Sequence, residues 1–180
     1  MEIVPTPIPD LFIIQPKVFE DERGYFYESY SKAIFEKNGI RADFVQDNQS
    51  LSQKRVLRGL HFQNPPFSQG KLVRAIKGGI FDVAVDLRKK SPTYGHHFDI
   101  ELNETNKTML WIPPGFAHGF LTLEDSTIFS YKCSNIYNKA SEDSIIWNDP
   151  TLEINWNISN PILSEKDKTG QLFKDFTSLF

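Results

Sequence analysis

The chain has 180 residues, a length that favours one domain with its own core over two independent domains. Its 20 Lys and Arg residues nearly balance 23 Asp and Glu residues, and no block of like charge occurs, which excludes a general affinity for nucleic acid or for acidic lipid. The single cysteine, Cys133, excludes an internal disulfide and a cysteine-based zinc site, and it fits a reducing, cytoplasmic location. We expect neither a signal peptide nor a membrane span, because the N-terminal stretch lacks a basic start and no apolar run is long enough.

Short strands separated by turns are expected along most of the chain. Aromatic residues make up 13% of the sequence, and 11 prolines and 10 glycines interrupt it, a combination that favours short strands over long helices. We expect strands at residues 11–14, 25–30, 44–51, 56–63, 71–77, 81–87, 97–102, 108–112, 119–123 and 127–133. Ser31 is positioned to cap a short helix that ends at Asn38-Gly39, and Ser164 to cap a second helix near the C-terminus.

Eight or more short strands with tight turns and no crossover helix predict a mainly β fold. An antiparallel jelly-roll barrel or sandwich with a few short helices fits this pattern, and a parallel α/β sheet does not. No repeat, linker or low-complexity segment divides the sequence. We therefore expect one domain over residues 1–180.

The stretch Arg58-Gly59-Leu60-His61 carries a side chain that titrates near neutral pH, with Lys71 ten residues further on. It is either the floor of an active site or the solvent face of an amphipathic strand, and the residues alone leave both open. Strict alternation would put Arg58 and His61 on opposite faces of the strand, and a bulge at Gly59 would bring them to the same face.

Further polar residues are placed to face one side of their strands. Gln46, Asn48 and Ser50 alternate along one strand and could hold a ligand rich in hydroxyl or amide groups. Asp82 sits in mid-strand, where a structural role and the support of a histidine across the barrel are both open. Asp86, near a turn, is expected to be structural.

The motif Pro113-Pro114-Gly115-Phe116-Ala117-His118 forms a proline-rigidified turn before a histidine, as in the second motif of cupin barrels. His61 and His118 fall short of the three or four protein ligands of a typical transition-metal site, so we expect no metal. The histidines are then free for acid and base chemistry.

Taken in order, these motifs resemble the dTDP-4-dehydrorhamnose 3,5-epimerases over residues 10 to 168. The resemblance rests on Arg23-Gly24, Gln46-Asp47-Asn48, Arg58-Gly59-Leu60-His61, Gln69-Gly70-Lys71, Asp82 to Arg88, Ser91 to Gly95, Ile112 to Phe120, Tyr131-Lys132-Cys133, Tyr137, Glu142, Trp147 to Pro150 and Leu163 to Asp167.

The resemblance implies a cupin-class homodimer that acts on dTDP-4-keto-6-deoxy-glucose without a metal or redox cofactor. It would invert C3 and C5, whose protons become acidic because both carbons are α to the C4 ketone, and give dTDP-4-keto-rhamnose. By resemblance, His61 is the base, Asp167 orients it, Lys71 holds the developing enolate, and Tyr131 returns a proton to the opposite face.

The resemblance also implies a substrate-binding set. Arg23, Arg58 and Lys166 suit the pyrophosphate, because guanidinium and ammonium groups bind phosphate oxygens. The remaining expected contacts are Gln46, Asn48 and Glu142 to nucleotide or sugar, Tyr137 stacked on thymine, His118 as a second histidine of the site, and Phe19, Arg23 and Glu28 in the neighbouring subunit's site.

Three other functions stay open at this point. The chain could be an epimerase that inverts only C3 or only C5, because sequence does not show the geometry around Tyr131. It could also be a non-catalytic cupin that binds nucleotide sugars, or a metal-dependent cupin.

Overall fold

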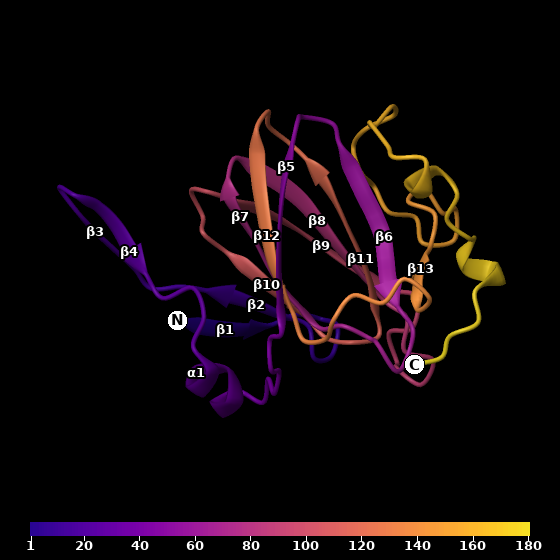
Figure 1. The fold of residues 1–180 in the computed structure, drawn as a ribbon, viewed down its shortest axis with the longest axis horizontal. Coiled ribbons are helices and arrows are strands. Elements are labelled where there is room, and N and C mark those ends of the chain that lie inside the picture. Colours follow the sequence, from indigo (N-terminus) through magenta and orange to yellow (C-terminus); the bar gives the residue numbers. More distant parts are fainter.

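The computed structural model describes residues 1–180 and consists mainly of short strands (Figure 1). The strands are β1 (Glu2–Pro5), β2 (Phe12–Gln15), β3 (Val18–Asp21), β4 (Gly24–Tyr27), β5 (Gln46–Ser52), β6 (Leu57–Gln63), β7 (Lys71–Lys77), β8 (Gly79–Asp86), β9 (His97–Asn103), β10 (Met109–Ile112), β11 (Phe116–Thr122), β12 (Thr127–Cys133) and β13 (Glu142–Ser144). One α-helix, α1 (Lys32–Lys37), and two 3-10 turns, Lys166–Lys168 and Phe173–Asp175, complete the structure.

Two antiparallel sheets face one another. The first has the strand order β1-β2-β10-β7-β12-β5 and the second β13-β6-β11-β8-β9, while β3 and β4 form a separate hairpin. This confirms the predicted mainly β, antiparallel two-sheet architecture. Strands close in sequence, such as β7 and β8, lie in opposite sheets, as a jelly roll requires.

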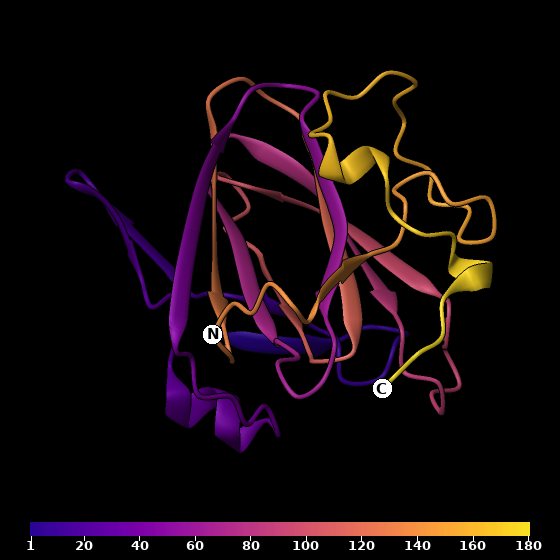
Figure 2. The ribbon, with the colours of Figure 1, turned by 45° about the vertical axis from the view of Figure 1, so that its right-hand side comes forward.

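The core has three layers because both sheets are covered on their outer faces. Between the sheets, side chains such as Val73, Ile80 and Phe129 alternate inward from their strands. The chain beyond residue 149 covers the outer face of the five-stranded sheet, with Trp156 buried there, and α1 covers the six-stranded sheet with Phe35 (Figure 2). Polar side chains that also face the gap between the sheets are therefore enclosed.

Several expected element bounds differ from those observed. Strands β7 and β12 match the prediction, but β11 begins at Phe116, because the proline turn ends at Gly115, whose φ is +92°. The short strands β1, β3 and β13 were not predicted. Their four, four and three residues give too little alternation to be seen in the sequence.

The expected C-terminal helix at Ser164 is wrong. Only a 3-10 turn forms there, in which the Asp167 amide donates to the Ser164 carbonyl oxygen over 3.1 Å. After this turn the chain runs alongside β13 and the residues that follow it. Gly170 lies so close to them that an added Cβ would be 2.6 Å from the Ile146 nitrogen. The first helix does form, although the Ser31 side chain makes no capping hydrogen bond.

No helix of the structure has both the length and the apolar character that crossing a membrane requires.

Candidate active site

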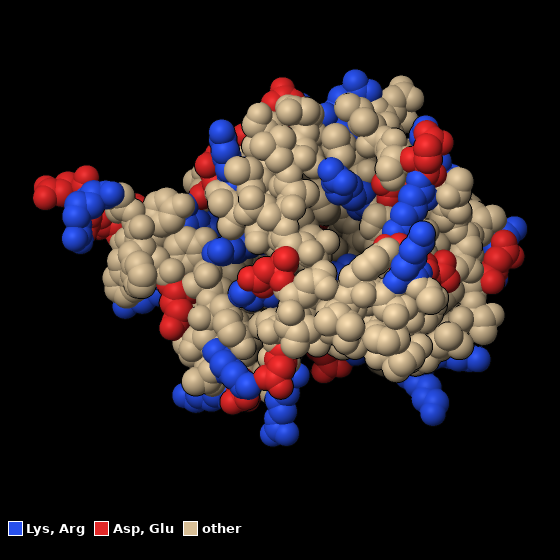
Figure 3. Space-filling model, in the orientation of Figure 1, with Lys and Arg blue, Asp and Glu red and all other residues tan.

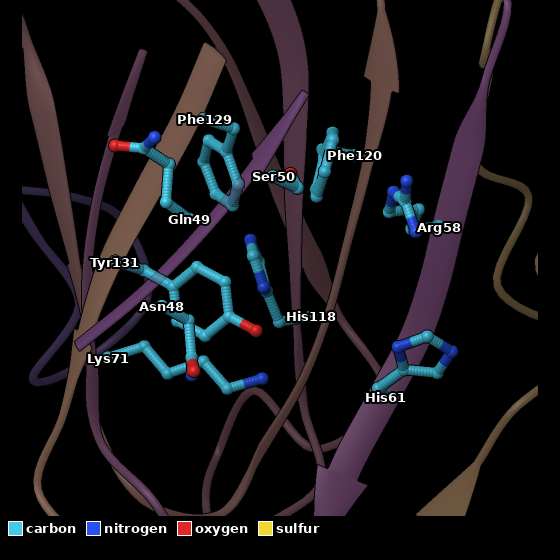
Figure 4. Close-up of a pocket in the computed structure, with 10 residues that line it drawn as sticks. All are labelled: Asn48, Gln49, Ser50, Arg58, His61, Lys71, His118, Phe120, Phe129 and Tyr131. Atoms are coloured by element: carbon cyan, nitrogen blue, oxygen red, sulfur yellow. The ribbon is translucent and has the colours of Figure 1, made fainter. Parts of the chain in front are cut away.

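A cavity of about 290 Å³ opens between the two sheets (Figure 4). Strands β5, β7 and β12 form one wall, and β6 and β11 form the other. Its lining residues are Asn48, Gln49, Ser50, Arg58, His61, Lys71, His118, Phe120, Phe129 and Tyr131. The fold therefore brings seven of the side chains that were expected to act or bind into one cavity, although they are separated by up to about 80 residues in the sequence.

Gly59 lets Arg58 and His61 face the same cavity. Its φ is +135°, and an added Cβ would lie 2.4 Å from the Gly119 Cα, so only glycine fits there. Opposite it, the pairing of β6 with β11 shifts register between His118 and Phe120. Leu57 accordingly packs into the outer core, whereas Arg58 and His61 both line the cavity, and the irregularity expected at Gly59 is confirmed.

His61 and Asp167 form a hydrogen-bonded pair at the edge of the cavity. Burial raises the pKa of the Asp167 carboxyl, but the hydrogen bonds from His61, the Ser164 hydroxyl and the Gly59 amide outweigh it and bring this pKa to about 2. The carboxylate is therefore ionised and accepts the hydrogen of His61 Nε2 over 2.6 Å. Figure 4 shows the other ring nitrogen of His61 on the cavity side, where it is available as a base.

Lys71 and Tyr131 lie on the wall opposite His61 (Figure 4). Lys71 Nζ is 5.9 Å from the Tyr131 ring centroid, and no carboxylate lies within 4.0 Å of this nitrogen. Burial lowers the pKa of Lys71 and raises the pKa of Tyr131. The wall thus offers an amine that no carboxylate pairs with and a hydroxyl that keeps its proton at neutral pH.

A second histidine–carboxylate pair lies deeper in the barrel. His118 Nε2 is 2.9 Å from Asp82 Oδ2, and both side chains are almost entirely buried. Burial lowers the pKa of His118, although Asp82 acts in the opposite direction. The ring of His118 packs beside Phe120 and Phe129, with centroid distances of 6.4 and 6.1 Å.

A polar network joins several of the other expected binding residues to Asn48, which lines the cavity. Glu142 pairs with Lys166 and accepts a hydrogen bond of 3.0 Å from the Tyr137 hydroxyl. Burial acts to raise the pKa of Glu142, but these two partners lower it overall. The Tyr137 amide donates to Gln46 Oε1 over 2.9 Å, and Gln46 Nε2 donates to Asn48 Oδ1 over 3.1 Å.

Basic groups also border the cavity. Arg58 and Lys71 line it, and Figure 3 shows Lys and Arg side chains around the hollow on this face. The Arg58 guanidinium is held by Ser52 Oγ, which accepts from Nε over 3.3 Å and from Nη2 over 3.2 Å. This arrangement suits an anionic group such as a phosphate.

Seven expected binding residues do not line this cavity: four belong to the polar network described above, and the other three are Phe19, Arg23 and Glu28. Phe19 and Arg23 belong to the β3–β4 hairpin, which projects beyond the sheets, and Glu28 directly follows it (Figure 1). Arg23 pairs with Asp21 at 2.5 Å, and its side chain is 84% exposed. Within one chain, therefore, the hairpin and the cavity are separate.

Some residues of the site were not among the expected ones. Phe120 and Phe129 line the cavity, and each is two positions from an expected residue on the same strand, His118 or Tyr131. The period of two along a strand would have identified them. Ser164 supports Asp167 through its hydroxyl, a contact for which the sequence carries no comparable signal.

The structure contains no group of three or more His, Cys, Asp or Glu side chains placed to hold a metal ion.

Comparisons with known proteins agree along nearly the whole chain. The family model described as dTDP-4-dehydrorhamnose 3,5-epimerase matches residues 5–175. The dTDP-4-dehydrorhamnose 3,5-epimerase of Shigella flexneri is 52% identical over 176 residues, which cover 97% of each chain.

Solved structures with this fold are similar in sequence as well. The dTDP-4-dehydrorhamnose 3,5-epimerase of Elizabethkingia anophelis superposes with a TM-score of 0.93 at 50% identity, covering 97% of both chains. The dTDP-6-deoxy-D-glucose-3,5-epimerase of Legionella pneumophila, solved with dTDP-4-keto-L-rhamnose, gives 0.93 at 47% identity and covers 98% of this chain and 94% of its own. A 3'-monoepimerase of Streptomyces bikiniensis, solved with dTDP-quinovose, gives 0.88 at 30% identity, with coverages of 94% and 86%.

Proposed function

Because the chain belongs to the dTDP-4-dehydrorhamnose 3,5-epimerase family, we propose that it converts dTDP-4-keto-6-deoxy-D-glucose into dTDP-4-keto-L-rhamnose by inverting C3 and C5. The observation that carries the mechanism is the position of His61 and Tyr131 on opposite walls of one cavity. A proton removed from one face of the sugar and returned from the other inverts the carbon between them.

His61 is the proposed base. The cavity-side nitrogen of its ring takes the proton from the carbon α to the ketone, and the ring becomes an imidazolium. Asp167 then stabilises that cation, because its ionised carboxylate is 2.6 Å from the other nitrogen. No other carboxylate lies within 4.0 Å of this histidine.

Lys71 and Tyr131 complete the proposed reaction on the opposite wall. As the proton leaves, charge moves onto the C4 oxygen, and the Lys71 ammonium stabilises the enolate. Tyr131 gives its hydroxyl proton to the carbon, which is possible although a phenol is a weak acid, because an enolate carbon is strongly basic. Solvent exchange resets His61 and Tyr131 before the second carbon reacts.

The binding roles follow the same division of the cavity. Arg58 and Lys166 are proposed to hold the pyrophosphate, and Tyr137, whose ring is half exposed, to stack on the thymine. Gln46, Asn48 and Glu142 would hydrogen-bond the nucleotide or the sugar, and His118 the sugar. The relative from Legionella pneumophila, with dTDP-4-keto-L-rhamnose bound, supports a dTDP-sugar as the ligand class.

The β3–β4 hairpin suggests a homodimer in which each hairpin enters the partner's site. Phe19 and Phe26 are 54% and 70% exposed on a two-stranded ribbon that lies away from the body of its own chain. Phe19, Arg23 and Glu28 would then bind the substrate held by the other subunit.

Mixed dimers test this arrangement. A dimer of one His61→Ala chain with one Arg23→Ala chain has one site with both defects and one intact site, so activity should return to about half of the wild-type value. If each hairpin served its own chain, both sites would be defective and the mixture would stay inactive.

Substrate turnover in heavy water tests the reaction itself. NMR of the product should show deuterium at both C3 and C5, because each carbon exchanges its proton with solvent through His61 and Tyr131. Exchange at one carbon only would assign the chain to the single-site epimerases, to which the 3'-monoepimerase relative belongs. If the dTDP-sugar bound but neither carbon exchanged its proton, the chain would be a non-catalytic cupin that binds nucleotide sugars.

The reaction needs no metal or redox cofactor, since proton transfer and one cation account for it. We also propose that the enzyme acts in the cytoplasm, where the single, buried cysteine would stay a free thiol.

A further inference from the structure

Asp82 is a buried charge that the proposed mechanism leaves without a role. It lies in the middle of β8, faces the space between the sheets and is 0% exposed. Its Oδ2 contacts His118, while its Oδ1 has no hydrogen-bond partner in the structure. A buried carboxylate with one unpartnered oxygen is costly, so its presence calls for a compensating function.

A second aspartate on the same strand shows what a structural carboxylate looks like here. Asp86 is also 0% exposed and faces the same way as Asp82, but it accepts hydrogen bonds from Arg88, Ser91 and Thr93. These donors satisfy both oxygens and tie down the turn after β8. Asp82 has one partner instead, and that partner lines the active-site cavity.

The negative charge of Asp82 affects the ionisation of two neighbouring side chains, His118 and Lys71. Burial keeps His118 neutral by lowering its pKa, so this histidine does not cancel the charge of Asp82. Lys71, on the opposite wall, has no carboxylate within 4.0 Å. The other titratable or charged groups that influence His118 and Lys71 are His61 on β6, Cys133 on β12, Glu142 on β13 and Lys166 in the 3-10 turn. The Tyr131 ring on β12 also lies beside Lys71.

We propose that Asp82 is a positioning residue for the reaction, acting through His118 and on Lys71. Its carboxylate holds the hydrogen of His118 on Nε2, which leaves Nδ1 as an acceptor for a hydroxyl of the sugar. Its negative charge also helps to keep Lys71 protonated, as enolate stabilisation requires. This inference rests on the proposed function, because it assigns Asp82 to that same site.

The two effects depend on one another. His118 Nδ1 makes no hydrogen bond within the chain, so a fixed tautomer presents a lone pair to a ligand rather than a hydrogen. A neutral His118 also adds no positive charge beside Lys71, so Asp82, together with Cys133 and Glu142, acts against the burial and the Lys166 charge that lower the pKa of Lys71. If Asp82 were purely structural, its replacement would change neither kcat nor the alkaline limb of the pH profile.

The variant Asp82→Asn, with Asp86→Asn as its control, tests the proposal. Loss of the charge at residue 82 should lower the pKa of Lys71, so the alkaline limb of the kcat/KM profile should move to lower pH. The value of kcat should fall more than KM rises. Asp86→Asn should lower Tm and leave the pH profile unchanged.

Nitrogen NMR of the His118 ring gives a readout that does not depend on turnover. In the wild-type protein His118 should be neutral at pH 7 with its hydrogen on Nε2, and in Asp82→Asn the other tautomer should appear. A wild-type ring that is cationic or protonated on Nδ1 would overturn the proposal even if the variant fails to fold. An unchanged tautomer and an unchanged alkaline limb in a folded Asp82→Asn protein would also overturn it.

Failure of the proposed function looks different. A wild-type protein that exchanges no deuterium into the sugar contradicts the epimerase mechanism, whatever the tautomer of His118. Normal wild-type turnover with an unaltered Asp82→Asn profile contradicts only the role of Asp82.

Discussion

The two histidine–carboxylate pairs of this barrel have the same chemistry and opposite surroundings. His61 is 29% exposed at the cavity, and its partner Asp167 accepts hydrogens from three separate groups. His118 is 6% exposed, and its partner Asp82 has one hydrogen bond and one unpartnered oxygen. The same two residue types thus differ in solvent exposure and in the number of hydrogen bonds that the carboxylate accepts.

The difference fits the roles proposed for the two histidines. A base must gain and lose a proton in every cycle, so it needs contact with solvent and a carboxylate that stays ionised throughout. Asp167, with a pKa of about 2, meets that condition. A residue that only presents a lone pair is better kept neutral, and burial does this for His118.

Replacing each histidine in turn should give the largest contrast. His61→Asn removes the proposed base, and kcat should fall by about 10³- to 10⁴-fold, the upper part of the range for general acid–base catalysis. His118→Asn removes one hydrogen-bond acceptor and should lower kcat/KM by about 10-fold. Steady-state kinetics checks both, and calorimetric titration with dTDP should show that the nucleotide still binds. Equal losses of kcat in the two variants would contradict the division of labour.

Asp167→Asn should produce the next largest effect on turnover. The variant keeps the shape of the side chain and loses the charge that is proposed to stabilise the His61 imidazolium. A charge-assisted hydrogen bond contributes about 1.5 to 3 kcal/mol, which corresponds to a fall in kcat of about 10- to 100-fold. Wild-type kcat in this variant would show that His61 acts without a carboxylate partner.

The same variant should change the dependence of stability on pH. The Asp167 pKa is about 2 in the folded protein, against 3.8 for the free side chain, so ionisation stabilises the fold above pH 4 and this contribution is lost as pH falls towards 2. At pH 7 the contribution is about 2 kcal/mol. Urea unfolding of wild type and Asp167→Asn between pH 2.5 and 7 should therefore show a gap that closes at the acid end. A gap independent of pH would mean that lost packing, rather than lost charge, is responsible.

The sequence carried enough information for the fold and for most of the cavity. Alternation along strands placed Gln46, Asn48 and Ser50 on one face, and the turn residues gave most strand positions correctly, because both signals are local. Even the irregularity that brings Arg58 and His61 together was visible in the sequence as a glycine between them.

Long-range pairings were beyond the residues alone. Asp167 is 106 positions from His61, and only the family resemblance suggested that they meet. The C-terminal segment was expected to be a helix because Ser164 resembles a capping residue, whereas its hydroxyl bonds the Asp167 side chain. A rule based on neighbouring residues cannot predict this contact, because Asp167 is held in place by its hydrogen bond to His61 on β6, which is distant in the sequence.

Ser164→Ala tests the smallest difference between the two pairs, namely the extra donors that Asp167 has and Asp82 lacks. Its hydroxyl donates to Asp167 Oδ2 over 2.5 Å, so its loss should raise the pKa of Asp167 and cost about 1.5 kcal/mol of unfolding free energy at pH 7. The value of kcat should fall only a few-fold, because His61 and the Gly59 amide still hold the carboxylate. Ser159→Ala, an exposed serine in the same C-terminal region, serves as the matched control and should change neither quantity. If Ser164→Ala matched Asp167→Asn in kcat, the serine would be needed to orient the pair, and the distinction between the two histidines would then rest on how many donors each carboxylate has rather than on exposure.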